Sequence, residues 1–137
     1  SLGGVVAVDA DDIWAVGASE GAPSYATRTL IERWNGSSWS IVQSPNVGTK
    51  GNSLFDIASV SAKSVWSAGY YVDQSDALDR TLIERWNGKA WRVVKSGNPG
   101  RDYDQLHAIW SIGQALWSAG NEQTGSDGDP LVESYCS

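Results

Sequence analysis

The sequence predicts an all-β fold made of tandem, four-stranded antiparallel units. Three observations support this prediction: a long internal repeat, short runs rich in Val, Ile, Trp and Tyr, and Asn-Gly pairs between such runs. The chain has 137 residues, of which 41% are hydrophobic and eight are Trp. This amount of apolar side chain is enough for a core, so we expect one folded array.

The internal repeat is the strongest of these signals. The segment TLIERWNG occupies residues 29–36 and occurs again, unchanged, at residues 81–88. The same spacing, from 29 to 81, aligns Trp14 with Trp66 and Trp39 with Trp91. A third copy begins at Leu106, loses one residue before Leu116 and ends in LVESYCS where the others have LIERWNG. We therefore expect units at residues 2–53, 54–105 and 106–137.

Each unit divides into four short strand-like runs. In the second unit they cover residues 54–61, 65–71, 81–86 and 91–95, and the third unit lacks its last run. The third and fourth runs are joined by Asn35-Gly36 or Asn87-Gly88. Asn-Gly is the strongest short hairpin signal, because both residues of such a turn have positive φ. The sequence therefore predicts hairpins at both sites.

Four antiparallel strands in a Trp-rich tandem unit of this length are the pattern of a β-propeller blade, with a flat solenoid as the alternative. The prediction is two complete blades and most of a third. Alternation of apolar and polar residues along the runs is weak. A blade explains this, because its neighbours cover both faces of its sheet.

The unit resembles a kelch-type blade at residues 13–17 (IWAVG), at residues 32–34 (ERW) and at Trp39. Kelch units typically carry a Gly pair after the second strand, whereas here Ala18, Tyr70 and Asn121 follow the first Gly. The chain is more similar to the kelch-like tandem repeats of bacterial extracellular propellers and lectins, along its whole length. The resemblance implies a propeller fold and an extracellular location, and it leaves function open because propellers have many functions.

Charge and composition exclude several classes of partner. The net charge of −6 argues against nucleic acid, because binding to phosphates needs clustered Lys and Arg. The sequence has no long apolar segment, so we expect no membrane partner. Its one cysteine, Cys136, forms no intrachain disulfide or cysteine-based metal cluster. We expect no cofactor and no metal.

Most of the tryptophans occupy repeated positions, which favours burial between blades over sugar binding. We expect Trp14, Trp66 and Trp117 in the core. Trp110 is different, because the equivalent positions hold Val6 and Ala58, and we expect it to line the central channel. The repeated Glu-Arg pairs at 32–33 and 84–85 are expected to be structural, since adjacent strand residues point to opposite faces. The Arg is expected to pair with an acid of the neighbouring blade or with backbone carbonyls.

Binding residues are expected on one face of the array. The turns between first and second and between third and fourth runs are short and uniform, whereas the segments at 18–28, 70–80 and 121–130 and the crossings at 45–53 and 97–105 differ in every unit. Variable loops on a repeated scaffold are where binding residues concentrate. The candidates are the tyrosines Tyr25, Tyr70, Tyr71 and Tyr103, the acids Asp73, Asp76, Asp79, Asp104, Glu122, Asp127 and Asp129, and Trp110.

The acidic loops raise the question of calcium. Their spacing does not match an EF-hand, so a solvated acidic loop is the preferred interpretation and calcium stays open. A hydrolase fragment is another alternative, because Asp56, His107 and Trp110 are candidates for the channel. The only histidine, His107, has no nucleophile assigned to it by spacing.

The predicted function is a non-catalytic binding module or scaffold, with a protein or a carbohydrate as partner. A lectin would repeat its sugar site between blades, whereas a protein-binding face can use dissimilar loops, as found here. Closed propellers have about four to eight blades. We therefore expect either part of a longer propeller or a homo-oligomer, most simply a dimer of six blades.

Overall fold

The all-β prediction is confirmed. The computed structural model describes residues 1–21 and 23–136, and its regular elements there are strands. They are β1 (Leu2–Asp9), β2 (Asp12–Glu20), β3 (Thr27–Trp34), β4 (Trp39–Ile41), β5 (Asn52–Ser61), β6 (Ser64–Val72), β7 (Asp79–Trp86), β8 (Trp91–Val94), β9 (Tyr103–Ile112), β10 (Ala115–Thr124) and β11 (Asp127–Cys136). No helix long and apolar enough to cross a membrane is found among the described residues.

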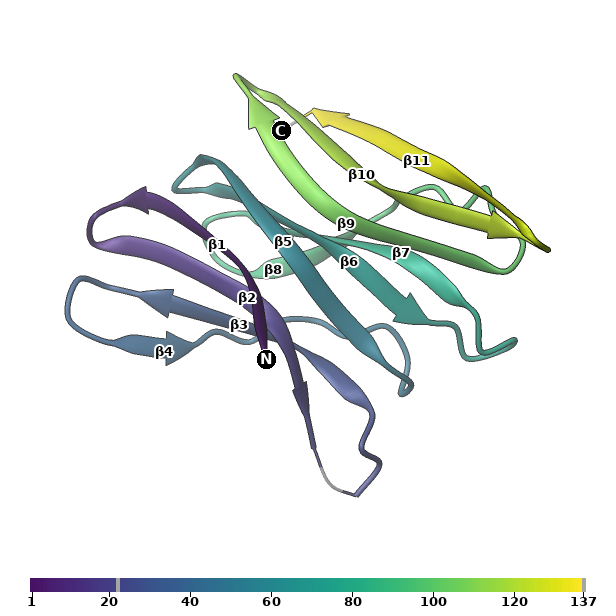
Figure 1. Cartoon of the computed structure of the whole chain (residues 1–137). Helices are drawn as coiled ribbons and strands as arrows, with labels where there is room; N and C mark the ends of the chain where they lie inside the picture. Colours follow the sequence, from purple (N-terminus) through teal and green to yellow (C-terminus); the bar gives the residue numbers. More distant parts are fainter. Residues whose placement is uncertain (22, 137) are drawn as a thin grey trace.

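The strands form two sheets. The first has the order β1-β2-β3-β4, and the second joins β5 to β11. Within the second sheet, β7 and β9 meet through a parallel bridge between Asp79 and Tyr103, whereas the neighbours on either side are antiparallel. The chain thus contains three consecutive antiparallel units, named here unit 1 (β1–β4), unit 2 (β5–β8) and unit 3 (β9–β11). They follow one another from the lower left to the upper right of Figure 1.

The core lies between the units. One cluster brings Trp14, Val16 and Ile31 of unit 1 against Leu54, Ile57, Leu82, Trp86 and Trp91 of unit 2. The other brings Ala58, Trp66 and Ile83 of unit 2 against Leu106, Ile109, Leu116 and Leu131 of unit 3. The sheet of unit 2 is therefore buried on both faces. This explains why apolar residues do not alternate with polar ones along its strands.

The prediction for the tryptophans is only partly correct. Trp14 and Trp66 are buried as expected, but Trp117, at the same position in unit 3, is exposed. The reason is that unit 1 lies against unit 2 and unit 2 against unit 3, while the equivalent face of unit 3 has no neighbour within the part of the chain that the structure describes. Trp110 pairs with Trp117 across β9 and β10 and shares this open face.

Each second strand contains a glycine because the backbone of the first strand approaches it too closely to leave space for a Cβ. A Cβ on Gly17, Gly69 or Gly120 would lie 2.0, 1.9 or 1.8 Å from a carbonyl oxygen at the start of the first strand or just before it. The pairing register of β1, β5 and β9 shifts at the same place, which leaves Gly3, Phe55 and His107 as bulged residues. The first strand of each unit is therefore bent where it approaches this glycine.

The Asn-Gly hairpins form, but with a different turn from the one predicted. Trp34 pairs with Trp39 and Trp86 with Trp91, so each loop has four residues rather than two. Within these two loops, only Gly36 and Gly88 have positive φ, both at 94°. The Asn35 carboxamide oxygen accepts hydrogen bonds from the N–H groups of Ser37 and Ser38, and Asn87 repeats this arrangement. The predicted turn needed positive φ at Asn as well as at Gly. In the observed loop the Asn residue does not have positive φ, and its side chain stabilises the turn through these hydrogen bonds instead.

The variable segments contain more strand than the sequence predicted. Segment 121–130 is the tip of the β10–β11 hairpin, with paired residues up to Thr124 and Asp127. Similarly, β2 extends to Glu20 and β7 begins at Asp79. Each crossing segment begins with the same hydrogen-bonded corner. Thr29 Oγ1 forms a hydrogen bond with Ser44 Oγ at 2.7 Å in unit 1, and Thr81 Oγ1 forms one with Ser96 Oγ at 2.6 Å in unit 2. These corners hold each crossing against the third strand.

The repeated Glu-Arg pairs have different environments. Arg33 forms an ion pair with Asp12 at 2.7 Å, in its own unit rather than in the neighbouring one as predicted, and its guanidinium lies 4.5 Å from the centre of the Trp14 ring. Arg85 lies over Trp66. Glu84 is fully buried, and neither carboxylate oxygen has a hydrogen-bond partner. Burial raises the pKa of Glu84 from 4.5 to about 8.

Glu84 should make the fold less stable as the pH rises. The folded chain holds this proton more tightly than the unfolded chain, so the contribution of Glu84 is fully present below pH 4.5 and is lost as the pH rises to about 8. The variant Glu84→Gln cannot ionise. We expect it to match the parent protein in acid and to exceed its free energy of unfolding by about 2–4 kcal/mol at alkaline pH. Urea unfolding across this pH range measures the difference.

The exposed variant Glu20→Gln controls for the loss of one negative charge. A difference between Glu84→Gln and the parent protein that does not change with pH would contradict this account.

Candidate ligand-binding face

The two ends of the sheets differ in the way the sequence predicted. One end carries the short turns β1–β2, β3–β4, β5–β6, β7–β8 and β9–β10. The other end, named here the loop face, carries the β2–β3, β6–β7 and β10–β11 connections and the crossings at 42–51 and 95–102. Antiparallel order requires this division, because consecutive connections lie at opposite ends of a sheet.

A cleft of about 460 Å³ opens at the loop face between units 1 and 2. Its lining combines glycine backbone, three hydroxyl side chains, one carboxylate and one aromatic ring. The residues are Ser1, Gly3, Gly17, Ala18, Glu20, Thr27, Ser53, Leu54 and Phe55. Such a mixture of an apolar wall and a few polar groups is typical of a site that orients a ligand.

Aromatic rings form a row beside this cleft. Phe55 lies 5.5 Å from Tyr70 and 5.1 Å from His107, centre to centre, and the planes of Phe55 and His107 differ by only 16°. His107 Nε2 is 2.8 Å from the Asn121 side-chain oxygen, which fixes the imidazole at the end of the row. The row links β6, β5, β9 and β10, and it therefore connects units 2 and 3 at the loop face.

The cleft exists because unit 1 has a glycine where the other units have a ring. Gly3, Phe55 and His107 are the bulged residues of the three first strands. Between units 2 and 3, the His107 ring stacks on Phe55. Between units 1 and 2, Gly3 has no side chain, so the corresponding space beside Phe55 is open to a ligand.

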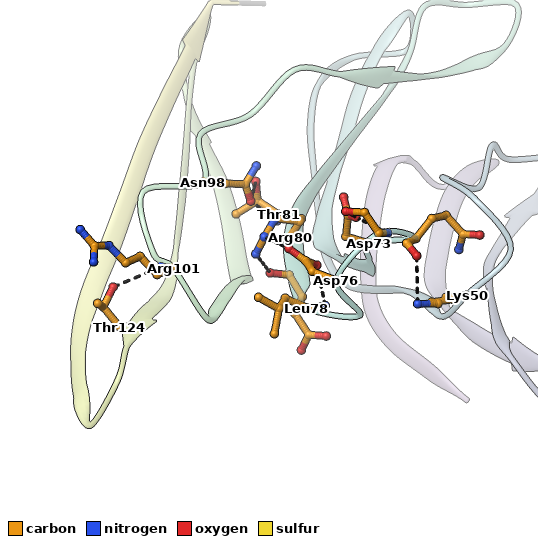
Figure 2. Close-up of polar contacts among 12 residues, drawn as sticks. Lys50, Asp73, Asp76, Leu78, Arg80, Thr81, Asn98, Arg101 and Thr124 are labelled. Atoms are coloured by element: carbon orange, nitrogen blue, oxygen red, sulfur yellow. Dashed lines mark hydrogen bonds and ion pairs between the residues drawn. The ribbon is translucent and has the colours of Figure 1, made fainter.

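Several of the acidic candidates stabilise their own loops. Asp73 accepts hydrogen bonds from the N–H and hydroxyl of Ser75, which lower its pKa. Asp76 accepts the Leu78 N–H at 2.9 Å and pairs with Arg80 at 2.7 Å. Figure 2 shows these side chains on the β6–β7 loop, between Lys50 and Arg101 on the flanking crossings. Their carboxylates are therefore committed to loop structure.

Two further acids connect neighbouring segments. Asp79, at the start of β7, accepts a hydrogen bond from the Gln105 amide of β9. Asp104 is buried and accepts the Gly100 N–H at 2.9 Å, while its second oxygen has no partner. Glu122, Asp127 and Asp129 lie apart from them, on the β10–β11 hairpin. The structure does not gather the acids into one site.

The tyrosine candidates are also dispersed. Tyr25 is exposed on the β2–β3 loop, with a positive φ of 53°. Tyr70 belongs to the aromatic row, and Tyr71 packs against the core between units 1 and 2. Burial, followed by the charge of Asp73, raises the pKa of Tyr71. Tyr103 is exposed at the start of β9. Trp110 lies on the open face of unit 3 and is not part of this cleft.

The sequence did not single out the residues that line the cleft. Glu20, Thr27 and Ser53 fall within the variable segments at 18–28 and 45–53, although none of them was named as a candidate. Gly3 and Phe55 lie inside first strands, and attention to the loops alone misses them. One signal was available, since the repeat places Gly3, Phe55 and His107 in register although their side chains differ completely. A position that varies inside a repeated strand can therefore indicate a binding site, just as a variable loop can.

Among the described residues, no group of three or more His, Cys, Asp or Glu side chains has an arrangement that would hold a metal ion. No protein-family model and no curated protein matches this chain. The geometry of the loop face is therefore the basis for a functional hypothesis.

The stack of Phe55 on His107 predicts a spectroscopic signature. The ring protons of the single histidine should resonate upfield, because they lie over the face of Phe55. In Phe55→Leu these NMR signals should move downfield, and the free energy of unfolding should fall by about 1 kcal/mol from the lost aromatic pair. Tyr25→Ala should leave the signals in place. Histidine signals that are unchanged in Phe55→Leu would exclude the stack.

Proposed function

We propose that this chain is part of a β-propeller in which units 1, 2 and 3 are successive blades. Three features support the proposal. Each unit is an antiparallel series of strands in chain order. The first strands are neighbours, with β1 against β5 and β5 against β9. The apolar clusters lie between units, as expected when blades pack face to face.

The proposed activity is non-catalytic binding of a partner protein at the loop face. The observation that carries it is the cleft beside Phe55, which combines an aromatic wall with the Thr27 and Ser53 hydroxyls and the Glu20 carboxylate. These groups suit a basic side chain presented by an extended segment of the partner. The net charge of −6 favours the approach of a basic partner.

The cleft arises from a difference between units rather than from the repeat itself. Phe55 and His107 close the equivalent place between units 2 and 3. A lectin with a sugar site in every groove would need the same lining at each boundary, so this asymmetry favours a protein partner. A glycan remains the second candidate, because a ring beside hydroxyl groups also suits the apolar and polar sides of a sugar.

The candidate residues for a hydrolase have structural partners instead. His107 is held between Phe55 and Asn121, and Asp56 Oδ2 accepts the Ile109 N–H of the next unit at 2.9 Å. Trp110 lies on the open face of unit 3. These contacts support binding over catalysis.

The test fills the cleft with a side chain that the fold already accepts at the equivalent position. In Gly3→His the ring should occupy the space beside Phe55, as His107 does between units 2 and 3. A Cβ at Gly3 would lie 3.0 Å from the Phe55 carbonyl oxygen, so a small local shift is needed. We expect parent protein to bind lysine- or arginine-containing peptides on a peptide array, and Gly3→His to lose at least tenfold in affinity, about 1.4 kcal/mol.

The matched control is Lys89→Ala in the β7–β8 turn at the opposite end of the sheets, which should bind like the parent protein. A glycan array run in parallel tests the second candidate. Binding of a glycan but of no peptide would replace the proposed partner, and equal binding by parent and Gly3→His would exclude the cleft.

A further inference from the structure

The two ends of the array carry exposed apolar faces that have buried equivalents inside the chain. On unit 1, Leu2 is 51% exposed and Trp39 46%, whereas Leu54 and Trp91, at the same positions in unit 2, are each 2% exposed. On unit 3, Trp117 is 38% exposed and Val132 58%, whereas Trp66 and Ile83 of unit 2 are 3% and 0% exposed. The positions are the same, and only the neighbour is missing.

These two faces correspond to the two sides of the interface between units 1 and 2. The exposed face of unit 1 corresponds to the face of unit 2 that covers Trp14 and Ile31. The exposed face of unit 3 corresponds to the face of unit 1 that holds Trp14 and Ile31. The interface between units 1 and 2 is therefore a template for contact between the two ends.

We infer that the exposed face of unit 3 binds the exposed face of unit 1 in a second copy of this chain. Apolar patches of more than a few hundred Å² are rarely left open on a monomer. Ser134 replaces Arg33 and Arg85 at the equivalent position of unit 3, so this face buries no guanidinium when it is covered.

A hollow on unit 1 receives the tryptophan of the partner copy. It has a volume of about 450 Å³ and is lined by Leu2, Val5, Ala15, Glu32 and Trp39 together with Gly3 and Gly4. Leu54, Ile57 and Trp91 are the equivalents of three lining residues, and they belong to one cluster with Trp14, whose ring lies 5.4 Å from that of Trp91. By the same relation, Trp117 of one copy packs edge-on against Trp39 of the other.

Two copies of these units give a number that suits a closed ring. Closed rings of such units contain about four to eight. Two copies of units 1 to 3 supply six units, which falls within this range. Each copy uses both of its ends, so the pair has two identical contacts related by a two-fold axis and no face remains open.

Light scattering coupled to size exclusion tests the assembly. The expected mass is twice the chain mass of 14.7 kDa. Val5→Arg on unit 1 and Val132→Glu on unit 3 should each reduce it to one chain, because each places a charge in the contact. Both positions are exposed in the single chain, so neither variant should impair folding, and circular dichroism checks this. Val93→Arg, on an exposed part of β8, is the control and should leave the pair intact.

Mixing the two charged variants provides the sharper test. In a pair of unlike chains, one contact joins Arg at position 5 to Glu at position 132, and the other contact is unaltered. Val5 and Val132 correspond to Ile57 and Ile31, which belong to one cluster. The mixture should therefore recover the twofold mass that neither variant shows alone.

A parent chain that stays single at every concentration contradicts the inference, and so does an open-ended series of larger species. A pair that dissociates with only one of the two substitutions, or a mixture that stays single, also overturns it. None of these results depends on ligand binding, so they leave the proposed function to its own test.

Discussion

Burial of sheet faces against the neighbouring unit is the constraint on which this structure depends. A four-stranded antiparallel sheet cannot bury its own faces, and here each face carries large side chains such as Trp14, Trp66 and Ile83. Contact with the next unit removes these side chains from water, at about 25 cal/mol for each Å² of apolar surface. The units are thus stabilised by one another, and a unit without a neighbour leaves its face open, as Trp117 shows.

The repeat allowed much of the fold to be predicted from the sequence. Trp, Ile and Leu recur at fixed positions because the same contact recurs, and the predicted runs agree with β5 to β8 to within a few residues. Glycines at 17, 69 and 120 were part of the motif, and their role in a close backbone approach became visible only in three dimensions. The burial of Glu84 was not predictable, since the same residue type at 32 and 133 is less buried.

The sequence indicated which end of the sheets carries the variable segments, but it did not indicate which residues line the cleft there. Loop variation correctly indicated where the units differ, but most acids in those loops form Asx-type turns or link neighbouring segments, as Asp73, Asp76 and Asp79 do. Hydrogen bonding within loops leaves no periodic signal in the sequence. The cleft depends instead on Gly3, a residue without a side chain, and its significance follows from Phe55 and His107 at the equivalent positions.

The tryptophans offer the most direct measurement of the central claim, that equivalent faces are covered whenever an equivalent neighbour is present. In protein labelled with 5-fluorotryptophan, ¹⁹F NMR gives one signal per indole, and Trp39→Phe and Trp117→Phe assign the two that matter. Upon dilution these two signals should move to solvent-exposed positions as the pair dissociates, while those of Trp14, Trp66 and Trp91 stay fixed. Signals of Trp39 and Trp117 that report solvent exposure at every concentration would contradict the claim.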